Sequence, residues 1–428
     1  MRKLICNEIG AKWAEYIITM LLPKKGEAVF MLLNKEKVKK FISLIIIWIF
    51  NCLPIKNNKI FMVSYYGSQY GCNPKYISEY IMKNYPKGYF DIVWAFHDLG
   101  SKKHLTGFRK VKTMSLRYFY ELCTSKVIVT NFRTTDLFIK RKHQFYIQTW
   151  HSSLRLKKIE KDAEDSLTAD YVQLAKNDSK KCDLLLSGCE VSTDIFRRAF
   201  WYKGNIFQKG SPRNDVFFQL NTEVRMKILK QLNISLDSKL VLYAPTFRKD
   251  GSLEVYDLDY EWISDELSKR FGGNWIFLIK LHPHLLSKSD QLKFGKNVLD
   301  VTSYDDIQEL LCISDILISD YSSLMFDFSI TKRPCFLYIP DILDYQKNER
   351  NLYFDVKDLP FICAYSNKDL AGKIAGFHYA QYEESLNDFL STIGSFENGK
   401  ASEDLVKLIN EVCFSDKRRK RSYATEAI

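Results

Sequence analysis

The stretch Ile316-Leu-Ile-Ser-Asp-Tyr-Ser-Ser-Leu-Met-Phe-Asp327 decides the fold. Its apolar start is typical of a buried strand, and a polar turn and the beginning of a helix follow. A strand that leads through a turn into a helix is one βα unit, and repeated βα units build parallel sheets. Ligands bind beyond the carboxyl ends of such strands, so this turn is an expected ligand site.

Further β-rich runs alternate with helical stretches on either side of this unit. A first series of candidate strands covers residues 60–65, 90–96, 127–131, 145–150, 184–187 and 206–209. A second series covers residues 240–244, 275–281, 298–301, 316–319 and 335–338. The two series predict an α/β protein with two Rossmann-like, doubly wound domains. The predicted divisions are an N-terminal helical segment (1–56), the two sheet domains (57–220 and 221–380) and C-terminal helices with a basic tail (381–428).

The composition favours an anionic partner. Lys and Arg number 63 against 51 Asp and Glu, which gives a formal net charge of +12. No nucleic-acid-binding motif accompanies this charge, so nucleic acid is not an expected partner. The ten cysteines show no CxxC pair and no zinc-like spacing, so neither a disulfide framework nor a structural metal is indicated, and a reducing compartment is the simpler interpretation. No metal ligand and no cofactor is predicted with certainty, and a requirement for a metal stays open.

An apolar run, Phe41-Ile-Ser-Leu-Ile-Ile-Ile-Trp-Ile-Phe50, follows the basic stretch Lys35-Glu-Lys-Val-Lys-Lys40. Even extended to Ile55 it is shorter than the roughly 20 residues that span a bilayer as a helix. It fits a helix lying in the interface of an anionic membrane, or equally a buried helix of the first domain. The basic end, Lys417-Arg-Arg-Lys-Arg421, is typical of a solvated tail, with attachment to a membrane surface as the alternative.

A first polar strand end is Gln148-Thr-Trp-His151. A neutral imidazole there could take a proton from an attacking hydroxyl, although a structural hydrogen-bonding role is the alternative. The residues that follow are candidate contacts of an acceptor or a phosphate: Ser152, Ser153, Lys157 and Lys158.

Two further strand ends offer groups for a phosphate. Gly210-Ser-Pro-Arg-Asn-Asp215 would hold Arg213 near the crevice, where a guanidinium can bind phosphate oxygens in bidentate fashion. A capped helix start explains the same residues equally well. Tyr243-Ala-Pro-Thr-Phe-Arg248 places the hydroxyl of Thr246 at the end of the first strand of the second series.

The last two strand ends combine cations, imidazoles and hydroxyls. In Phe277-Leu-Ile-Lys-Leu-His-Pro-His284, strand alternation puts Lys280 and His282 on one side, where they could neutralise a phosphate leaving group. In the opening stretch, Ser322 and Ser323 begin a helix, and Asp327 lies one turn further on the same side, where it could bind ribose or polyol hydroxyls. Pro283 as a strand terminator and ordinary N-capping are the alternatives.

The sequence argues against several common chemistries. It has no GxxxxGK[ST] loop, no GxGxxG after the first strand and no GxSxG elbow. ATP hydrolysis, dehydrogenation and serine hydrolysis are therefore disfavoured.

Taken together, the five stretches resemble the CDP-glycerol glycerophosphotransferase family, the teichoic acid polymerases and primases of bacteria. The resemblance runs from about Lys59 to Asp358 and includes Gly71-Cys-Asn-Pro74, Lys332-Arg-Pro334 and Tyr353-Phe-Asp355. It implies a GT-B fold, with a central cleft between an acceptor domain and a donor domain. This sequence departs from the family pattern after His151. The family usually has Gly-Thr-Pro-Leu there, and this chain has Ser152-Ser-Leu-Arg155.

The resemblance also implies roles. His151 would activate the acceptor hydroxyl, and His282 would stabilise the departing CMP. The implied CDP-glycerol contacts are Arg213, Pro245, Thr246, Lys280, Ser322, Ser323 and Asp327. The implied reaction moves glycerol phosphate to a lipid-linked polyol-phosphate or glycan acceptor, in teichoic acid or capsule synthesis, at the cytoplasmic face of the membrane.

The altered loop after His151 leaves other functions open. One is a transferase of the same fold that uses CDP-ribitol or a nucleotide sugar, and another is a catalytically inactive scaffold at the membrane. The acceptor, the choice between primase and polymerase, and the oligomeric state also stay open.

Overall fold

The computed structural model describes residues 35–219, 222–248, 251, 253–281, 295–348 and 351–425. Its contacts divide the chain after Leu53, and each part is described by itself. In the first part, helix α3 (Lys35–Asn51) contains the apolar run. None of the helices in the described ranges is both long and apolar enough to cross a bilayer.

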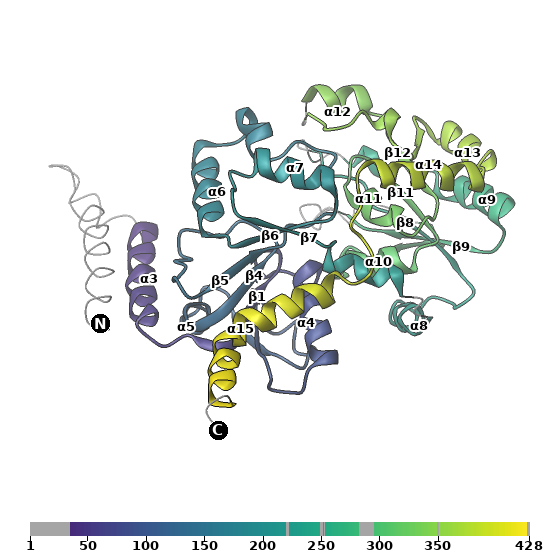
Figure 1. Cartoon of the computed structure of the whole chain (residues 1–428). Coiled ribbons are helices and arrows are strands. Elements are labelled where there is room, and N and C mark those ends of the chain that lie inside the picture. The colour runs from purple at the N-terminus through teal and green to yellow at the C-terminus, as the bar shows by residue number, and fades with distance from the viewer. Residues whose placement is uncertain are drawn as a thin grey trace. The chain divides into compact units, whose positions relative to one another are not determined.

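The second part contains two sheets, and all strand pairs in both are parallel (Figure 1). The first sheet has the order β3-β2-β1-β4-β5-β6-β7. Its strands are β1 (Lys56–Val63), β2 (Asp91–Phe96), β3 (Arg109–Lys112), β4 (Ser125–Thr130), β5 (Phe145–Gln148), β6 (Leu184–Ser187) and β7 (Asn205–Gln208). The helices that accompany it in the chain are α4 (Cys72–Asn84), α5 (Leu116–Thr124), α6 (Ala169–Lys181) and α7 (Glu190–Ala199).

The second sheet has the order β10-β9-β8-β11-β12-β13. Its strands are β8 (Lys239–Tyr243), β9 (Trp275–Ile279), β10 (Val298–Asp300), β11 (Ile316–Ser319), β12 (Cys335–Tyr338) and β13 (Ile362–Ala364). The accompanying helices are α8 (Thr222–Gln231), α9 (Tyr260–Phe271), α10 (Ile307–Ile313), α11 (Leu324–Ser329), α12 (Ile342–Asn348), α13 (Asn367–Ala375) and α14 (Tyr379–Thr392). Both orders reverse direction once, as in a doubly wound sheet, so the predicted fold class is confirmed.

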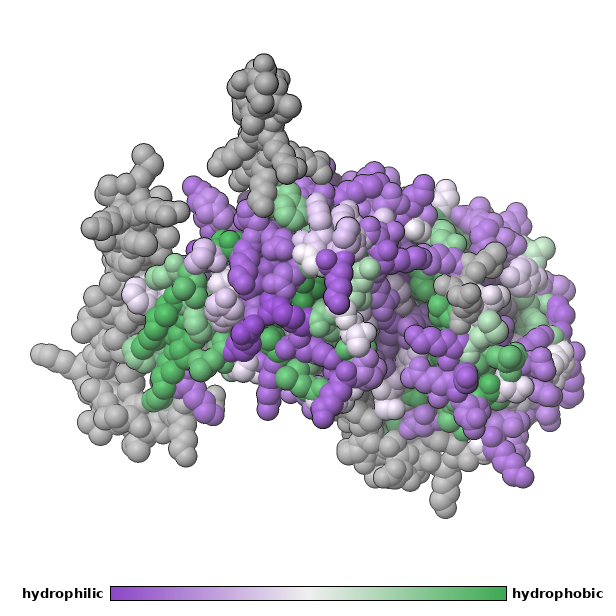
Figure 2. Space-filling view, turned by 90° about the horizontal axis from the view of Figure 1, so that it is seen from below, coloured by the Kyte–Doolittle hydropathy of each residue, from purple (hydrophilic) through white to green (hydrophobic). Residues whose placement is uncertain are grey.

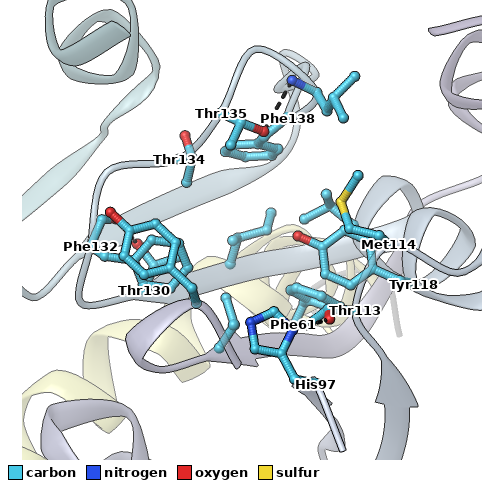
Figure 3. A pocket seen from close by; sticks show the side chains of 15 residues that line it. Phe61, His97, Thr113, Met114, Tyr118, Thr130, Phe132, Thr134, Thr135 and Phe138 are labelled. Carbon is cyan, nitrogen blue, oxygen red and sulfur yellow. Dashed lines mark hydrogen bonds between the residues drawn. The ribbon is translucent and has the colours of Figure 1, made fainter. Parts of the chain in front are cut away.

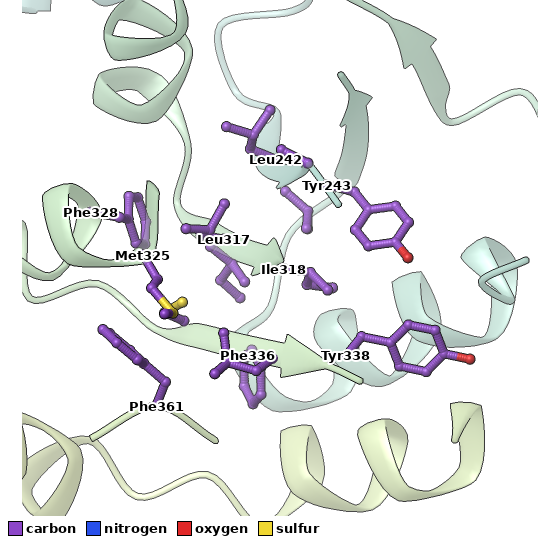
Figure 4. Close-up of a cluster of buried hydrophobic side chains, with 14 of the residues drawn as sticks. Leu242, Tyr243, Leu317, Ile318, Met325, Phe328, Phe336, Tyr338 and Phe361 are labelled. Carbon is purple, nitrogen blue, oxygen red and sulfur yellow. The ribbon is translucent and has the colours of Figure 1, made fainter. Parts of the chain in front are cut away.

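The central strands are apolar on both faces because helices cover both faces of a parallel sheet. In the second sheet, β11 and β12 are buried along their whole length. Figure 4 shows side chains of β8, β11 and β12 packed with Met325 and Phe328 of α11. This packing fixes the turn between β11 and α11, where the sequence predicts a ligand site.

The last helix, α15 (Ala401–Thr425), returns to the first sheet. Its residues Leu405, Val406 and Ile409 belong to the same buried cluster as β1, β2 and β4. The carboxylate of Asp215 accepts hydrogen bonds from the amides of Ala401 (3.0 Å) and Ser402 (2.7 Å) at the start of α15. The C-terminal helix is therefore part of the first sheet's core, and the basic run 417–421 continues its backbone helix.

Candidate active site

Four of the five polar strand ends, those after β5, β8, β9 and β11, lie at or next to the point where a sheet reverses its winding, and the fifth follows the edge strand β7. In the first sheet the reversal falls between β1 and β4, and β5 lies next to β4. In the second sheet it falls between β8 and β11, and β9 lies next to β8. Because all pairs are parallel, the carboxyl ends of these strands share one edge of each sheet, and the crevice at such an edge is the usual ligand site.

His151 follows β5 and is held by the segment after β4. Its Nδ1 lies 3.2 Å from the carbonyl oxygen of Asn131. A carbonyl only accepts hydrogen bonds, so Nδ1 carries the proton and Nε2 keeps a lone pair. The ring also stacks on Trp150, with the ring centroids 4.6 Å apart. The hydrogen bond thus fixes the tautomer that a general base needs.

The surroundings of His151 keep its imidazole neutral at pH 7. Desolvation by the enclosing protein lowers the pKa of His151 to about 4, and the positive charges of Arg155 and Arg213 lower it further. The bond to Asn131 opposes this shift. The residue nevertheless keeps an exposed surface, so a substrate can reach it.

Arg213 and Asp327, both predicted to contact the donor, form a buried ion pair with each other. The Ser153 hydroxyl donates a 2.8 Å hydrogen bond to Asp327 Oδ1, and the side-chain Nδ2 of Asn214 donates to the same oxygen over 3.3 Å. This cluster links the segments after β5 and β7 to helix α11. Its members are brought together here, and their contacts with a donor stay a prediction.

The sequence interpretation missed Glu397, which lies between α14 and α15. Its carboxylate accepts hydrogen bonds from the amide of Ser211 (3.1 Å) and from Nδ2 of Asn214 (3.0 Å). A Cβ at Gly188 or Gly210 would come within 2.8 or 2.9 Å of its oxygens. Burial raises the pKa of Glu397 to about 8. No motif marks this residue, because it follows no strand.

In the second sheet, Pro245 is buried and Thr246 half-buried beyond β8. The amide and hydroxyl of Thr246 donate to Asp320 Oδ1 over 2.8 and 2.7 Å, and Asp320 follows β11 directly. The two strands at the reversal point are therefore tied together. Asp320 was not singled out in the sequence, although its position in the opening stretch could have revealed it.

Lys280 directly follows β9, and its ammonium group donates to the carbonyls of Val301 (3.4 Å), Thr302 (3.0 Å) and Tyr304 (2.7 Å). Burial lowers the pKa of Lys280 to about 8, against the opposing pull of nearby aspartates. All three ammonium donors are thus directed at backbone, and the side chain contributes a positive charge to the site. His282 lies outside the described residues, so its pairing with Lys280 stays a prediction.

Ser322 and Ser323 are half-buried at the start of α11. Ser323 occupies the N-cap position, but its hydroxyl makes no capping hydrogen bond. The Ser322 hydroxyl accepts a long bond, 3.4 Å, from the amide of Leu324. Ordinary N-capping therefore does not account for Ser323.

The candidate acceptor contacts lie on one extended segment. Ser152 is half-buried, and Lys157 and Lys158 are half-buried beside residues 351–352. Lys157 pairs with Leu352 in an antiparallel bridge, and the Lys158 amide bonds to the Asn351 carbonyl over 2.9 Å. The structure therefore places these lysines along the same segment as His151.

An apolar cavity of about 180 Å³ lies on the first sheet beside this site (Figure 3). Its polar corner is the 2.6 Å contact between His97 Nδ1 and the Thr113 hydroxyl. Tyr66 lines the cavity, whereas the adjacent Tyr65 has its ring 6.5 Å from that of His151. None of the predicted site residues that the structure describes lines the cavity, and its apolar walls do not suit a diphosphate.

The two doubly wound sheets, with a neutral imidazole on one and cations and hydroxyls on the other, define a protein of the GT-B fold class. The chain belongs to the CDP-Glycerol:Poly(glycerophosphate) glycerophosphotransferase family, which residues 45–411 match. The predicted family and GT-B fold are therefore confirmed.

Curated relatives agree with this membership. The teichoic acid poly(glycerol phosphate) polymerase of Staphylococcus epidermidis is 34% identical over 371 residues, which are 83% of this chain and 51% of that protein. The polymerase of Bacillus subtilis is 30% identical over 369 residues, 83% of this chain and 49% of that protein. The chain thus spans about half the length of these two. The teichoic acid glycerol-phosphate transferase of Staphylococcus aureus is 30% identical over 403 residues, 88% of this chain and 99% of that protein.

Solved structures agree as well. The wall teichoic acid polymerase TagF matches with a TM-score of 0.76 and 31% identity, over 92% of this chain and 99% of that chain. A histidine-to-asparagine variant of TagF soaked with CDPG matches with a TM-score of 0.77 and 32% identity, over 90% of this chain and 96% of that chain.

Proposed function

We propose that this chain transfers glycerol phosphate from CDP-glycerol to a hydroxyl of a teichoic acid acceptor and releases CMP. The observation that carries the proposal is His151, a neutral imidazole whose Nε2 lone pair is fixed at an accessible strand end. Family membership and the printed activities of the relatives support the choice of donor and acceptor.

The proposed reaction needs one base and a stabilised leaving group. The acceptor oxygen attacks the phosphorus that carries glycerol, and its proton passes to Nε2 of His151. A phosphodiester bond forms while the bond from that phosphorus to the oxygen of CMP breaks. The leaving CMP takes up negative charge, which nearby cations stabilise.

The donor is proposed to lie at the carboxyl ends of β8, β9 and β11. Lys280 supplies positive charge, Ser322 and Ser323 supply hydroxyls, and Pro245 and Thr246 flank them. His282 completes this group on the strength of the family resemblance. Because Arg213 and Asp327 satisfy each other, their proposed contact with the donor requires this pair to exchange partners.

The acceptor is proposed to approach along the segment that follows His151. Ser152, Ser153, Lys157 and Lys158 lie on this segment, and a lipid-linked polymer of glycerol phosphate carries phosphates that the lysines could attract.

We further propose that the enzyme works at an anionic membrane surface through α3. The side chains of Val38, Ile42, Ile45 and Ile49 recur at helical spacing and are exposed, as is Trp48. Figure 2 shows hydrophobic side chains gathered on this helix. An apolar stripe next to lysines is typical of a helix that lies in a membrane interface.

The test is CMP release from CDP-glycerol, CDP-ribitol and a panel of nucleotide sugars, with a glycerol-phosphate acceptor. We expect release from CDP-glycerol, lowered about 10²- to 10⁴-fold in His151→Ala with CDP-glycerol binding retained. His97→Ala is the matched control, because His97 lines the apolar cavity and should leave turnover unchanged. Release from another donor alone would replace CDP-glycerol, and full turnover in His151→Ala would remove the base.

A further inference from the structure

Four arginines are buried among the residues that the structure describes, and three of them have carboxylate partners. The paired ones are Arg133 with Glu160 and Asp178, Arg213 with Asp327, and Arg248 with Asp320 and Asp341. The fourth, Arg155, forms no ion pair within the described ranges. Buried charges are normally paired, because an isolated one loses its hydration without compensation.

Arg155 is buried, with only 3% of the residue exposed. Its Nη2 donates to the carbonyl of Ser152 over 3.2 Å. Among the residues that the structure describes, none accepts a hydrogen bond from its Nε or Nη1. The guanidinium group lies over the Phe196 ring at 4.3 Å, a contact that supplies no hydrogen-bond acceptor for the N–H groups of these two nitrogens. Two nitrogens of the guanidinium thus lack an acceptor in the described part of the chain.

Arg155 belongs to the His151 segment. Its positive charge acts on His151, as does that of Arg213. Ser153 lies between His151 and Arg155 in the chain. Its hydroxyl donates a hydrogen bond to Asp327, which holds the backbone of this segment in place. His151 is exposed and Ser152 half-buried, so the segment that carries Arg155 reaches the surface of the protein a few residues before it.

We propose that Arg155 is an anion-binding residue of this site, and that a phosphate oxyanion of a substrate is the partner its guanidinium lacks. This inference rests on the proposed function and adds a binding residue to it. The planar fork of a guanidinium suits phosphate oxygens, and a partly desolvated site strengthens the contact. The phosphate comes either from the diphosphate of the donor or from a phosphodiester of the acceptor.

A phosphate bound to Arg155 would also change the electrostatic potential at His151. Desolvation lowers the pKa of His151, and the positive charge of Arg155 adds to this effect before substrate arrives. Once a phosphate neutralises Arg155, the imidazolium that forms during proton transfer is repelled less. Arg155 thus acts on catalysis through binding and through the charge state of His151.

The test replaces Arg155 by Met, which keeps the length of the side chain and removes its charge. Inorganic pyrophosphate is the first probe, because its binding needs no turnover. We expect pyrophosphate to raise the unfolding temperature of the wild type and to have about 10- to 100-fold weaker affinity for Arg155→Met. Without ligand, Arg155→Met should unfold at the same temperature as the wild type or higher, because an unpaired buried charge is removed. Arg198→Met is the control, since that exposed arginine pairs with Asp162 at the surface.

Two further arms identify the phosphate. If CDP-glycerol binds Arg155→Met more weakly while cytidine binds equally, the donor diphosphate is the ligand. If CDP-glycerol binding is unchanged and the KM for a glycerol-phosphate oligomer rises about tenfold or more, the acceptor is the ligand. Arg155→Met that unfolds earlier, with unchanged affinity for all of these ligands, would overturn the proposal. In the remaining outcome, the wild type binds pyrophosphate and loses this binding in Arg155→Met, yet releases no CMP from any donor. That combination of results would support the anion site and reject the proposed function.

Discussion

At the scale of the residue, one hydrogen bond decides what His151 can do. The Asn131 carbonyl fixes the proton on Nδ1 and directs the basic Nε2 away from the backbone. Desolvation by the surrounding protein and two neighbouring guanidiniums then keep the ring neutral. The environment of His151 therefore keeps it available as a base, because the same side chain on an open loop would be half protonated near pH 6.5.

This environment gives a prediction for the pH dependence. The pKa of His151 is lowered to about 4, so the ring is neutral above that pH and protonated below it. We expect kcat/KM to show no loss from protonation of His151 between pH 7 and pH 5, and an acid limb only nearer pH 4. A pH profile of CMP release measures this. A limb near pH 6.5 that disappears in His151→Ala would contradict the assigned environment.

A second residue, Ser323, separates ligand binding from helix capping. Its hydroxyl makes no capping bond, so Ser323→Ala should leave the urea midpoint of unfolding unchanged. If the hydroxyl binds a donor phosphate, CDP-glycerol binding should weaken by about 1 to 3 kcal/mol. Calorimetric titration and urea unfolding of the same variant measure the two effects. Lost stability with unchanged affinity would identify a capping residue.

At the scale of the element, the interior strands followed from their apolar patterns, whereas two edge strands did not. Strand β3 reads Arg-Lys-Val-Lys and β13 has three residues, so neither shows a clear β pattern. Each lies at the edge of its sheet. Edge strands are short or charged because such features discourage pairing with other chains. Their strand conformation comes from the neighbour to which they pair.

Helix α3 carries the prediction at this scale. Replacing Ile42 and Ile49 by Ser removes two exposed members of the apolar stripe. This change should weaken binding to anionic phospholipid vesicles about tenfold or more, because fully burying one such side chain is worth about 1.5 to 3 kcal/mol. Vesicle co-sedimentation measures the binding. Leu236→Ser is a matched control, because this leucine is exposed elsewhere in the chain. Unchanged binding in the double variant would turn attention to the basic run 417–421.

At the scale of the molecule, distant segments meet in one buried network. Asp327 lies in α11, Arg213 and Asn214 follow β7, and Glu397 precedes α15. The side-chain amide of Asn214 nevertheless donates to the carboxylates of both Asp327 and Glu397. The network therefore connects the segment after β7 and helix α11 to the chain that leads into the C-terminal helix. Deforming it would strain the His151 loop, since Ser153 is one of its members.

Glu397 makes stability depend on pH. Its pKa is raised from 4.5 to about 8 in the folded chain, so the folded state binds a proton that the unfolded state releases. Its contribution to stability is complete below about pH 4.5 and is lost as the pH rises towards 8. We expect Glu397→Gln, which keeps the shape, to flatten the fall in unfolding temperature between pH 5 and pH 8. An unchanged slope in calorimetry would show that Glu397 does not titrate in this range.

The sequence by itself determined the two series of strands, the family, and the positions of His151, Lys280 and the two serines, because apolar periodicity and strand-end motifs are local. Tertiary structure alone decided that Arg213 meets Asp327, that Glu397 joins them, and that Arg155 is buried without an ion-pair partner in the described ranges. These pairings join residues far apart in the chain. Burial and charge compensation depend on what surrounds a side chain, and the chain supplies those surroundings only once it is folded.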